Sequence, residues 1–248
     1  SDDLIQCVMA GDVEDYQAAN ALHVAILSVK IAMGLQYDSA ALERLALAGL
    51  LHDLGMWLMP QGIIEKPGSL DEEERAVICA HPEEGRRIIA GMGESCEWLA
   101  TAIAQEHERW DGSGYPCRLK GTDITEPAQI IGLADMLDAL ITPRPYHARL
   151  MPHQALRKML VEHSRTFQPR LLKTMVDQLS LYPVGTAVRL NDGHVGVVSR
   201  VNPRCPLRPV LLVRRTQDGR TTGGTDPLDL SHETSRHIVE VLPATRAA

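Results

Sequence analysis

The sequence predicts a mainly α-helical protein that ends in a small antiparallel β module. Apolar residues recur at helical spacing through about the first 180 residues, with capping residues or prolines where helices would begin. After Tyr182-Pro183 the pattern changes to short runs rich in β-branched residues, separated by Asn-Asp-Gly and Asp-Gly turn signals. We therefore expect two domains, residues 1–182 and residues 183–248.

The first two predicted helices have clear ends. Apolar residues at helical spacing cover 17–34, and the segment ends in glycine. Asp38 or Ser39 is suited to cap the second helix, expected over 41–55. Its apolar stripe consists of Leu42, Leu45, Ala46 and Leu50. This second helix carries His52-Asp53 at its end.

Further helix starts follow from capping residues and prolines. Residues 69–72 (Ser-Leu-Asp-Glu) have the pattern of a capping box. A long helix is expected over 94–108, followed by a Gly- and Pro-rich loop over 111–127. Proline is tolerated in the first turn of a helix because its missing N–H is not needed there, and it marks four more starts: Pro82, Pro127, Pro152 and Pro169.

The C-terminal segment carries three predicted strands, at 186–190, 194–201 and 209–215, with turns at 191–193 and 218–219. No chemical motif occurs in it, although it is rich in arginine. It is interpreted either as a packing or solubility appendage or as a regulatory surface for a partner. Because aromatic residues are not interleaved with the arginines, direct nucleic-acid binding is not expected.

Composition excludes several classes of protein. The 248 residues carry a net charge of −7, which argues against a sequence-independent duplex binder. No apolar run is long enough to span a membrane, and the N-terminal residues lack the features of a signal peptide. The five cysteines are scattered without a CxxC pair, which is typical of reduced thiols. We therefore expect a cytoplasmic protein that does not contact membranes.

Imidazole and carboxylate groups recur at a spacing that suits a helical bundle. His23, His52, His81, His107 and Asp135 are separated by 29, 29, 26 and 28 residues, and each belongs to a different predicted helix. One group from each helix can meet at one end of a bundle, which is how metal sites in bundle cores are built. Neutral imidazoles and carboxylates suit Fe, Mn, Ni, Co or Zn, and Asp53 is placed to bridge two ions. A single histidine on an apolar helix is more often an ordinary packing residue.

Several motifs lie around these residues: LLHDLG, Lys66-Pro67-Gly68, HPEEG from His81, HERWDGSGYP over 107–116, LKG over 119–121, ADMLDAL around Asp135, and Arg144-Pro145-Tyr146. In order and spacing they resemble the HD-GYP family, a branch of the HD metal-dependent phosphohydrolases. The resemblance covers about 23–169. It implies an HD-domain helical bundle and cleavage of cyclic di-GMP to linear pGpG, in some members onward to GMP, in bacterial second-messenger signalling.

Carried over residue by residue, the resemblance makes seven residues metal ligands: His23, His52, Asp53, His81, Glu106, His107 and Asp135. In one division, His23, His52, Asp53 and Asp135 hold one ion, and Asp53, His81, Glu106 and His107 hold the other. Asp53 would be the catalytic bridge that holds the attacking hydroxide. Tyr115, Arg144 and His147 would contact substrate. The cofactors implied are two divalent transition metals (Fe, Mn, Ni or Zn, with Fe or Mn favoured).

The chain departs from the family pattern at four positions. Glu106 stands where the family has histidine, and Ala19 stands where some members have a glutamate for a third metal, so two metals are expected. Met56 and His147 stand where lysine is common. Losing one charge-assisted phosphate contact costs about 1.5–3 kcal/mol, so the expected activity is low.

Three functions therefore remain open. The first is a phosphodiesterase acting on cyclic di-GMP, with pGpG as product. The second is a weakly active or inactive module that binds cyclic di-GMP and docks a partner, such as a diguanylate cyclase (GGDEF) domain, through the GYP loop. The third is an HD hydrolase that acts on another nucleotide, including pGpG itself. Retention of the ligand set favours the first over the second, and the GYP-type loop argues against distant HD branches without separating cyclic di-GMP from related cyclic dinucleotides.

Overall fold

The computed structural model describes residues 8, 16–142, 150–179, 182, 184–202, 205, 207–215 and 227–242. The chain divides into two compact units, 1–175 and 176–248, which are considered separately below. The dividing point falls within helix α10 (Pro169–Leu179), slightly before the position expected from the change in sequence pattern.

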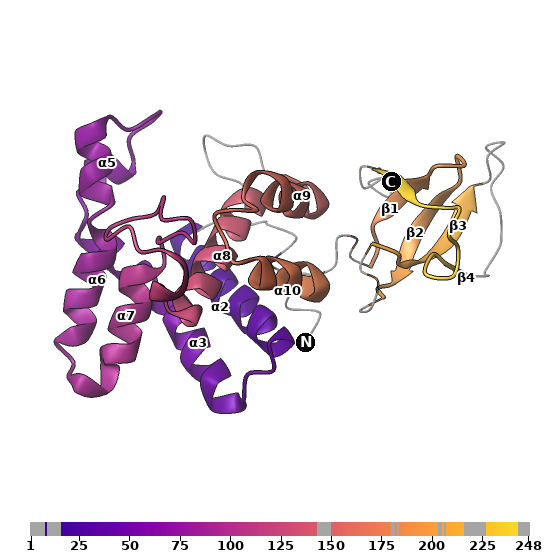
Figure 1. Ribbon diagram of the computed structural model, residues 1–248. Coiled ribbons are helices and arrows are strands. Elements are labelled where there is room, and N and C mark those ends of the chain that lie inside the picture. The colour runs from indigo at the N-terminus through magenta and orange to yellow at the C-terminus, as the bar shows by residue number, and fades with distance from the viewer. Residues whose placement is uncertain are drawn as a thin grey trace. The chain divides into compact units, whose positions relative to one another are not determined.

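The first unit is built from helices, as predicted (Figure 1). In chain order they are α2 (Tyr16–Gly34), α3 (Ser39–Leu51), η1 (Leu54–Leu58), α4 (Gln61–Ile64), α5 (Glu72–Ile78), α6 (His81–Ala90), η2 (Glu94–Cys96), α7 (Glu97–Gln105), η3 (Gly121–Asp123), α8 (Glu126–Ile141), α9 (Pro152–Glu162) and α10. The η elements are short 3-10 helices.

The helix ends confirm most of the predicted caps. The Asp38 side chain accepts a hydrogen bond from the Ala41 N–H at 2.8 Å, so Asp38 caps α3. The capping box expected at 69–72 is wrong by two residues, because the reciprocal bonds join Asp71 and Glu74. The carboxylate of Asp71 reaches the N–H three residues ahead, and Ser69 lies before the helix.

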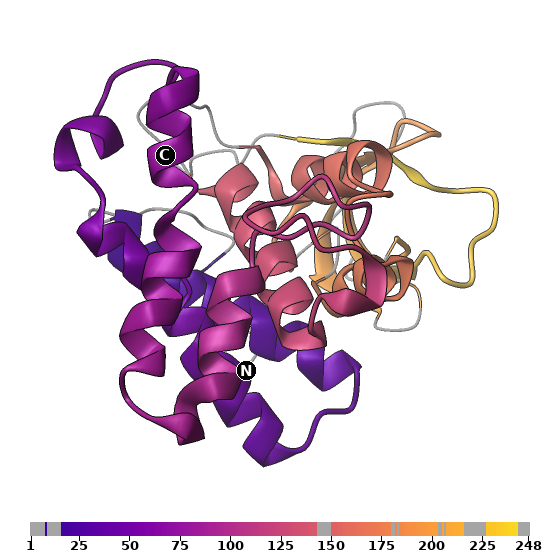
Figure 2. The same ribbon diagram turned by 60° about the vertical axis from the view of Figure 1, so that its left-hand side comes forward.

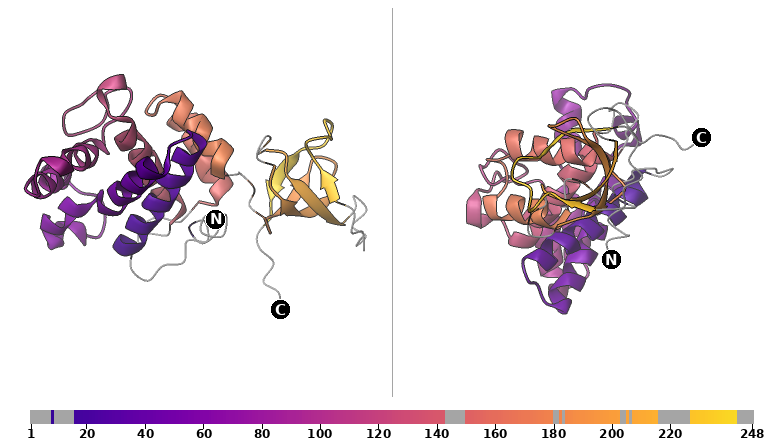
Figure 3. Two further views of the ribbon diagram at one scale, coloured as in Figure 1. Left: turned by 90° about the horizontal axis from the view of Figure 1, so that it is seen from below. Right: turned by 90° about the vertical axis from the view of Figure 1, so that its right-hand side faces the viewer.

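Two packed groups of helices make the core of this unit. Helix α2 packs against α3 and α8, and its course beside them is visible in Figure 3. Helix α6 packs against α7 and η1, and Figure 2 shows α6 and α7 side by side. The largest fully buried side chains include Leu27, Ile31, Ile103, Ile130, Leu133 and Leu137. Truncating one of them to alanine is expected to cost about 2–5 kcal/mol.

The second unit is a five-stranded antiparallel sheet in the order β4-β3-β2-β1-β5. Its strands are β1 (Ala187–Leu190), β2 (Val195–Arg200), β3 (Val210–Arg215), β4 (Pro227–Asp229) and β5 (Ile238–Val241). The first three were predicted, and the turn before β2 contains Gly193 with a φ of 84°. A buried cluster of Val188, Leu190, Val198, Leu211 and Leu230 forms its core.

Several arginines of the β unit have internal partners. One Arg208 nitrogen donates to the Leu230 and Glu233 carbonyls at 3.1 and 2.7 Å. Arg189 pairs with Glu240 across neighbouring strands at 2.7 Å. These bonds stabilise the sheet and its loops, so part of the arginine content of this unit serves its own fold.

Two expectations from composition, on membrane spans and on cysteines, can be compared with the described residues. None of the helices in the described part of the chain is long and apolar enough to cross a membrane. The cysteines described, Cys79, Cys96, Cys117 and Cys205, are free thiols.

Candidate metal centre

His52 and Asp53 enter the site from the end of α3. The His52 Nδ1–H donates to the Gly49 carbonyl at 2.8 Å. This carbonyl can accept the bond because the last carbonyls of a helix have no N–H partner within the helix. This bond fixes the ring with its Nε2 as the atom left for the site. His52 is 0% exposed, and its Nε2 lies 3.5 Å from Asp53 Oδ2.

His81 begins α6 and meets Asp53 because η1 lies close against α6. A Cβ at Gly55 would collide with the His81 carbonyl oxygen and lie 2.7 Å from the Gly85 nitrogen, so only glycine allows this approach. The His81 Nδ1–H donates to the Ile78 carbonyl at 2.7 Å. Its Nε2 then lies 3.2 Å from Asp53 Oδ1.

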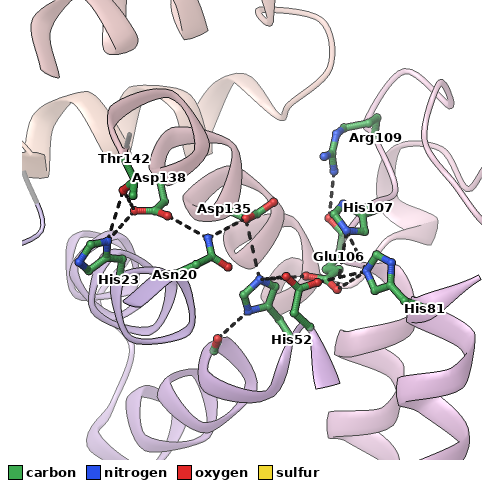
Figure 4. A network of polar contacts seen from close by, with 12 residues as sticks. Asn20, His23, His52, His81, Glu106, His107, Arg109, Asp135, Asp138 and Thr142 are labelled. Atoms are coloured by element: carbon green, nitrogen blue, oxygen red, sulfur yellow. Dashed lines mark hydrogen bonds and ion pairs between the residues drawn. The ribbon is translucent and has the colours of Figure 1, made fainter. Parts of the chain in front are cut away.

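Glu106 and His107 come from the end of α7. Glu106 is 0% exposed, and the His107 Nε2 lies 3.1 Å from the His81 Nε2. Helix α8 approaches them through Gly132, where a Cβ would overlap the Glu106 carbonyl oxygen. This close approach carries Asp135 to within 3.9 Å of His52, from its Oδ1 to the Nε2 (Figure 4).

These groups form a metal-ligand arrangement among the described residues. Asp53, His81, Glu106 and His107 each offer one ligand atom, and all four atoms lie within 4.8 Å of one another. Nitrogen and oxygen ligands lie about 2.0–2.2 Å from zinc-like ions, so ligands of one ion are about 3–4 Å apart. The distances in the cluster, 3.1 Å between the two imidazoles and 3.2 Å between His81 and Asp53, fit this requirement.

Unsatisfied polar atoms point to the same conclusion. Within the described part of the chain, His52 Nε2 and both Glu106 carboxylate oxygens are buried without a hydrogen-bond partner. Leaving a buried polar atom unpaired costs about 1–3 kcal/mol, and more for a charged group. A bound divalent ion would satisfy all three atoms, so the residues present fit the metals that the sequence implies.

The electrostatics of the cluster reflect its crowded carboxylates and imidazoles. Burial lowers the pKa of His52, but Glu106, Asp53 and Asp135 outweigh burial and raise it to about 9. Burial also lowers the pKa of His81, but the nearby carboxylates of Asp53 and Glu106 outweigh burial and raise it to about 10. Burial raises the pKa of Glu106 to about 7. Burial and the neighbouring His81 hold the pKa of His107 well below its usual value, which keeps this ring neutral.

His23 lies one step away from the cluster. Its Nδ1 lies 2.7 Å from Asp138 Oδ1, which also accepts a 2.7 Å hydrogen bond from Thr142. The amide of Asn20 donates to Asp138 at 2.9 Å and to Asp135 at 3.3 Å, so it joins His23 to the cluster (Figure 4). Metal-binding histidines typically donate one ring N–H to a carboxylate in this way. The bond leaves Nε2 of His23 as its ligand atom.

The GYP loop is anchored beside the cluster by Glu108. This buried carboxylate accepts hydrogen bonds from the N–H groups of Cys117 and Leu119 at 2.7 and 2.9 Å. Tyr115 stacks on His107, with ring centroids 4.7 Å apart. Arg109 follows Glu108 directly in the chain. Its NH1 nitrogen donates to the Glu106 and Glu108 carbonyls at 2.9 Å.

The structure thus brings together His52, Asp53, His81, Glu106, His107 and Asp135, and links His23 to them through Asn20. Arg144 and His147 lie outside the described residues. Sequence reasoning missed Asn20 and Glu108. Asn20 lies one helical turn before His23, a position where a side chain shares the same helix face, and this spacing was the available signal.

Comparison with known proteins identifies the family of the chain. Residues 10–171 match a family model described as HD domain, and residues 187–247 match one described as KOW domain associated with HD domain. The cyclic di-GMP phosphodiesterase PA4108 of Pseudomonas aeruginosa is 31% identical over 206 residues, 83% of this chain and 50% of the relative. The 3'3'-cGAMP-specific phosphodiesterase 2 of Vibrio cholerae is 32% identical over 160 residues, 64% of this chain and 31% of the relative.

The fold also has a solved counterpart. The structure of Bd1817, described as an HDG"Y"P protein from Bdellovibrio bacteriovorus, matches with a TM-score of 0.59 at 23% identity, covering 71% of this chain and 57% of the other. The chain spans half or less of the length of the two curated relatives named above. The resemblance drawn from the motifs is confirmed, and the chain belongs to the HD domain family.

Proposed function

We propose that this chain is a metal-dependent phosphodiesterase that hydrolyses cyclic di-GMP to linear pGpG. The observation that carries the proposal is the cluster of Asp53, His81, Glu106 and His107. Both Glu106 oxygens and the neighbouring His52 Nε2 are buried there without a hydrogen-bond partner among the described residues. Relatives named cyclic di-GMP phosphodiesterases support the substrate class. Their names, together with those of the cGAMP-specific relatives, indicate a cyclic dinucleotide.

The residues of the chain have distinct roles in this proposal. When bound, divalent ions supply a Lewis acid for the phosphodiester and make water a stronger acid. His52 and His81 present Nε2 because their Nδ1–H groups are held by backbone carbonyls. Asp53 directs one oxygen towards the His52 ring and the other towards the His81 ring, so it would be the catalytic carboxylate shared by ions held on the two sides. We assign His23 and Asp135 to the His52 side, and Glu106 and His107 to the His81 side.

Substrate contacts come from the loop and from η1. Tyr115, stacked on His107, is proposed to lie against the bound phosphodiester or its ribose. Trp57 on η1 is 80% exposed, and it follows Asp53 by four residues, so its ring face is accessible to a base. Arg144 is proposed to bind a phosphate oxygen through its planar guanidinium, and His147 is proposed to contact the substrate as well.

The test is a turnover assay under anaerobic, reducing conditions with Mn(II) or Fe(II). Cyclic di-GMP, 3'3'-cGAMP and pGpG are supplied separately, and the products are separated by anion-exchange chromatography. The proposal predicts pGpG from cyclic di-GMP, and a loss of at least about 100-fold in His81→Ala. The matched control is Glu84→Gln, which removes a negative charge that pairs with Arg87 on α6, the helix that also carries His81.

A second candidate is a binding module with negligible turnover. Met56 favours this candidate. It lies on η1, three residues after Asp53, and it is uncharged where a lysine would bind phosphate. Binding of cyclic di-GMP without detectable product in the same assay would replace the enzyme by this second candidate. In that role the loop over 111–120 is the proposed docking surface for a diguanylate cyclase domain.

A further inference from the structure

The two oxygens of the Glu106 carboxylate face opposite halves of the cluster. Oε1 lies 3.7 Å from the His81 Nε2 and 3.9 Å from the His107 Nε2. Oε2 lies 3.9 Å from the His52 Nε2. Figure 4 shows Glu106 between His52 and His81, with dashed lines to both rings.

Asp53 divides its oxygens in the same way. Its Oδ1 lies 3.2 Å from the His81 Nε2, and its Oδ2 lies 3.5 Å from the His52 Nε2. Asp53 and Glu106 therefore each direct one carboxylate oxygen towards the His52 ring and the other towards the His81 ring. Any pair of ions bound on the His52 side and the His81 side would have an oxygen of each carboxylate on either flank.

The surroundings of Glu106 leave its carboxylate no other partner. The side chain is fully buried, and neither oxygen has a hydrogen-bond partner among the described residues. Its position is fixed through the backbone, since Arg109 donates to its carbonyl oxygen and Gly132 packs against that same atom. An imidazole at position 106, the residue type that the family has there, would offer only one nitrogen to the cluster.

We propose that Glu106 is a second bridging carboxylate, which makes the metal pair of this chain a doubly carboxylate-bridged centre. The inference rests on the metal binding in the proposed function, but not on turnover. Two anionic bridges lower the net charge of the ion pair. They also make the donor set richer in oxygen than a histidine at this position would, which favours Mn(II) and Fe(II) over softer ions.

The experiment compares Mn(II) binding and magnetic coupling in four proteins: the wild-type chain, Glu106→Gln, Glu106→His and the control Glu84→Gln. Metal content is measured after anaerobic dialysis against Mn(II), and the electron paramagnetic resonance spectrum reports whether the ions are exchange-coupled. Circular dichroism verifies that each variant is folded. Glu84 is on α6 with its side chain paired to Arg87, so its replacement changes charge without removing a ligand.

The proposal predicts two coupled Mn(II) ions in the wild type and in Glu84→Gln. Glu106→Gln should bind the second ion at least tenfold more weakly. Glu106→His should retain two ions but show clearly weaker coupling, because one imidazole nitrogen does not span both.

A single ion in the wild type overturns the proposal, as does unchanged coupling in folded Glu106→His with both ions bound. Failure of the proposed function has a different signature. Two coupled ions without hydrolysis of any cyclic dinucleotide would leave the bridge intact and remove the enzyme activity.

Discussion

Asp138 holds His23 through a 2.7 Å contact between its Oδ1 and the ring Nδ1. The same oxygen accepts a bond from the Thr142 hydroxyl, and the other oxygen accepts one from the Asn20 amide at 2.9 Å. All these groups are buried, so the carboxylate cannot exchange its partners for water. Asp138 therefore orients His23, although only the imidazole belongs to the ligand set that the sequence implies.

Replacing Asp138 by asparagine tests this positioning role. The isosteric amide loses a charge-assisted bond, so the free energy of unfolding should fall by about 1.5–3 kcal/mol in chemical denaturation. Metal affinity should fall about 10- to 100-fold in a calorimetric titration. Thr142→Val is the control, since it removes one bond to the same oxygen but keeps the charge of Asp138 and its contact with His23, so metal affinity should change far less. Equal metal affinity in wild type and Asp138→Asn would contradict the assignment.

Metal affinity should also depend on pH. In the metal-free protein the pKa values of His52 and His81 are raised to about 9 and about 10, so both rings are protonated at neutral pH. A metal ion binds only the deprotonated ring and must release these protons. Affinity should therefore rise about tenfold per pH unit for each proton displaced, between pH 6 and 9. Titration in weak buffer should detect the released protons, whereas a flat affinity over that range would exclude the predicted competition.

The approach of η1 to α6 gives a third prediction. Gly55→Ala would place a methyl group against the His81 carbonyl, so unfolding stability should fall by about 1–3 kcal/mol and metal affinity should weaken. Gly62→Ala is a matched control in α4, where nothing lies within 4 Å of the added Cβ. That change should be neutral or stabilise by up to about 1 kcal/mol. Thermal unfolding of the two variants distinguishes the effects, and equal stability would show that the contact is unimportant.

The anchor of the GYP loop gives a fourth prediction. Glu108→Gln places an amide NH2 opposite the backbone N–H of Cys117 or Leu119, so one hydrogen bond is lost and two donors face each other. Limited proteolysis within 111–120 should become faster and KM for the cyclic dinucleotide should increase, while metal content stays unchanged. Asp111→Asn, an exposed change in the same loop, should affect each measurement far less. A loss of metal from Glu108→Gln would instead place this residue in the metal centre.

Much of the helical unit could be predicted from local signals. Asp38 caps α3, and α9 and α10 begin at Pro152 and Pro169. These rules are local because a cap or a proline acts on the neighbouring turn alone. The register of α5 was misjudged because both Ser69 and Asp71 are good caps, and only the position of the helix decides between them.

The edges of the sheet could not be predicted in the same way. Strand β4 has three residues and begins with proline, and β5 has four. Such segments are too short to show an alternating pattern. They form strands because β4 pairs with the outer edge of β3 and β5 pairs with the outer edge of β1.

The candidate metal site could be predicted from the sequence as a set of residues but not as a geometry. The spacing of His52, His81 and His107 indicated convergence, and Asp53 follows His52 directly. Glu106 entered the set only through the family resemblance. Nothing in the sequence shows that Asp53 and Glu106 each face both halves of the cluster. That relation depends on close helix contacts at Gly55 and Gly132, which are set by packing between segments far apart in the chain.

Anomalous diffraction from Mn(II)-loaded crystals grown under reducing conditions tests the central claim most directly. The account predicts two ions about 3.5–4 Å apart. Asp53 and Glu106 should lie between them, with His52 on one side and His81 on the other. The claim would be contradicted if metal-replete crystals showed no anomalous density in this cluster. The side chains of the cluster, which are His52, Asp53, His81, Glu106, His107 and Asp135, would then contact water or one another.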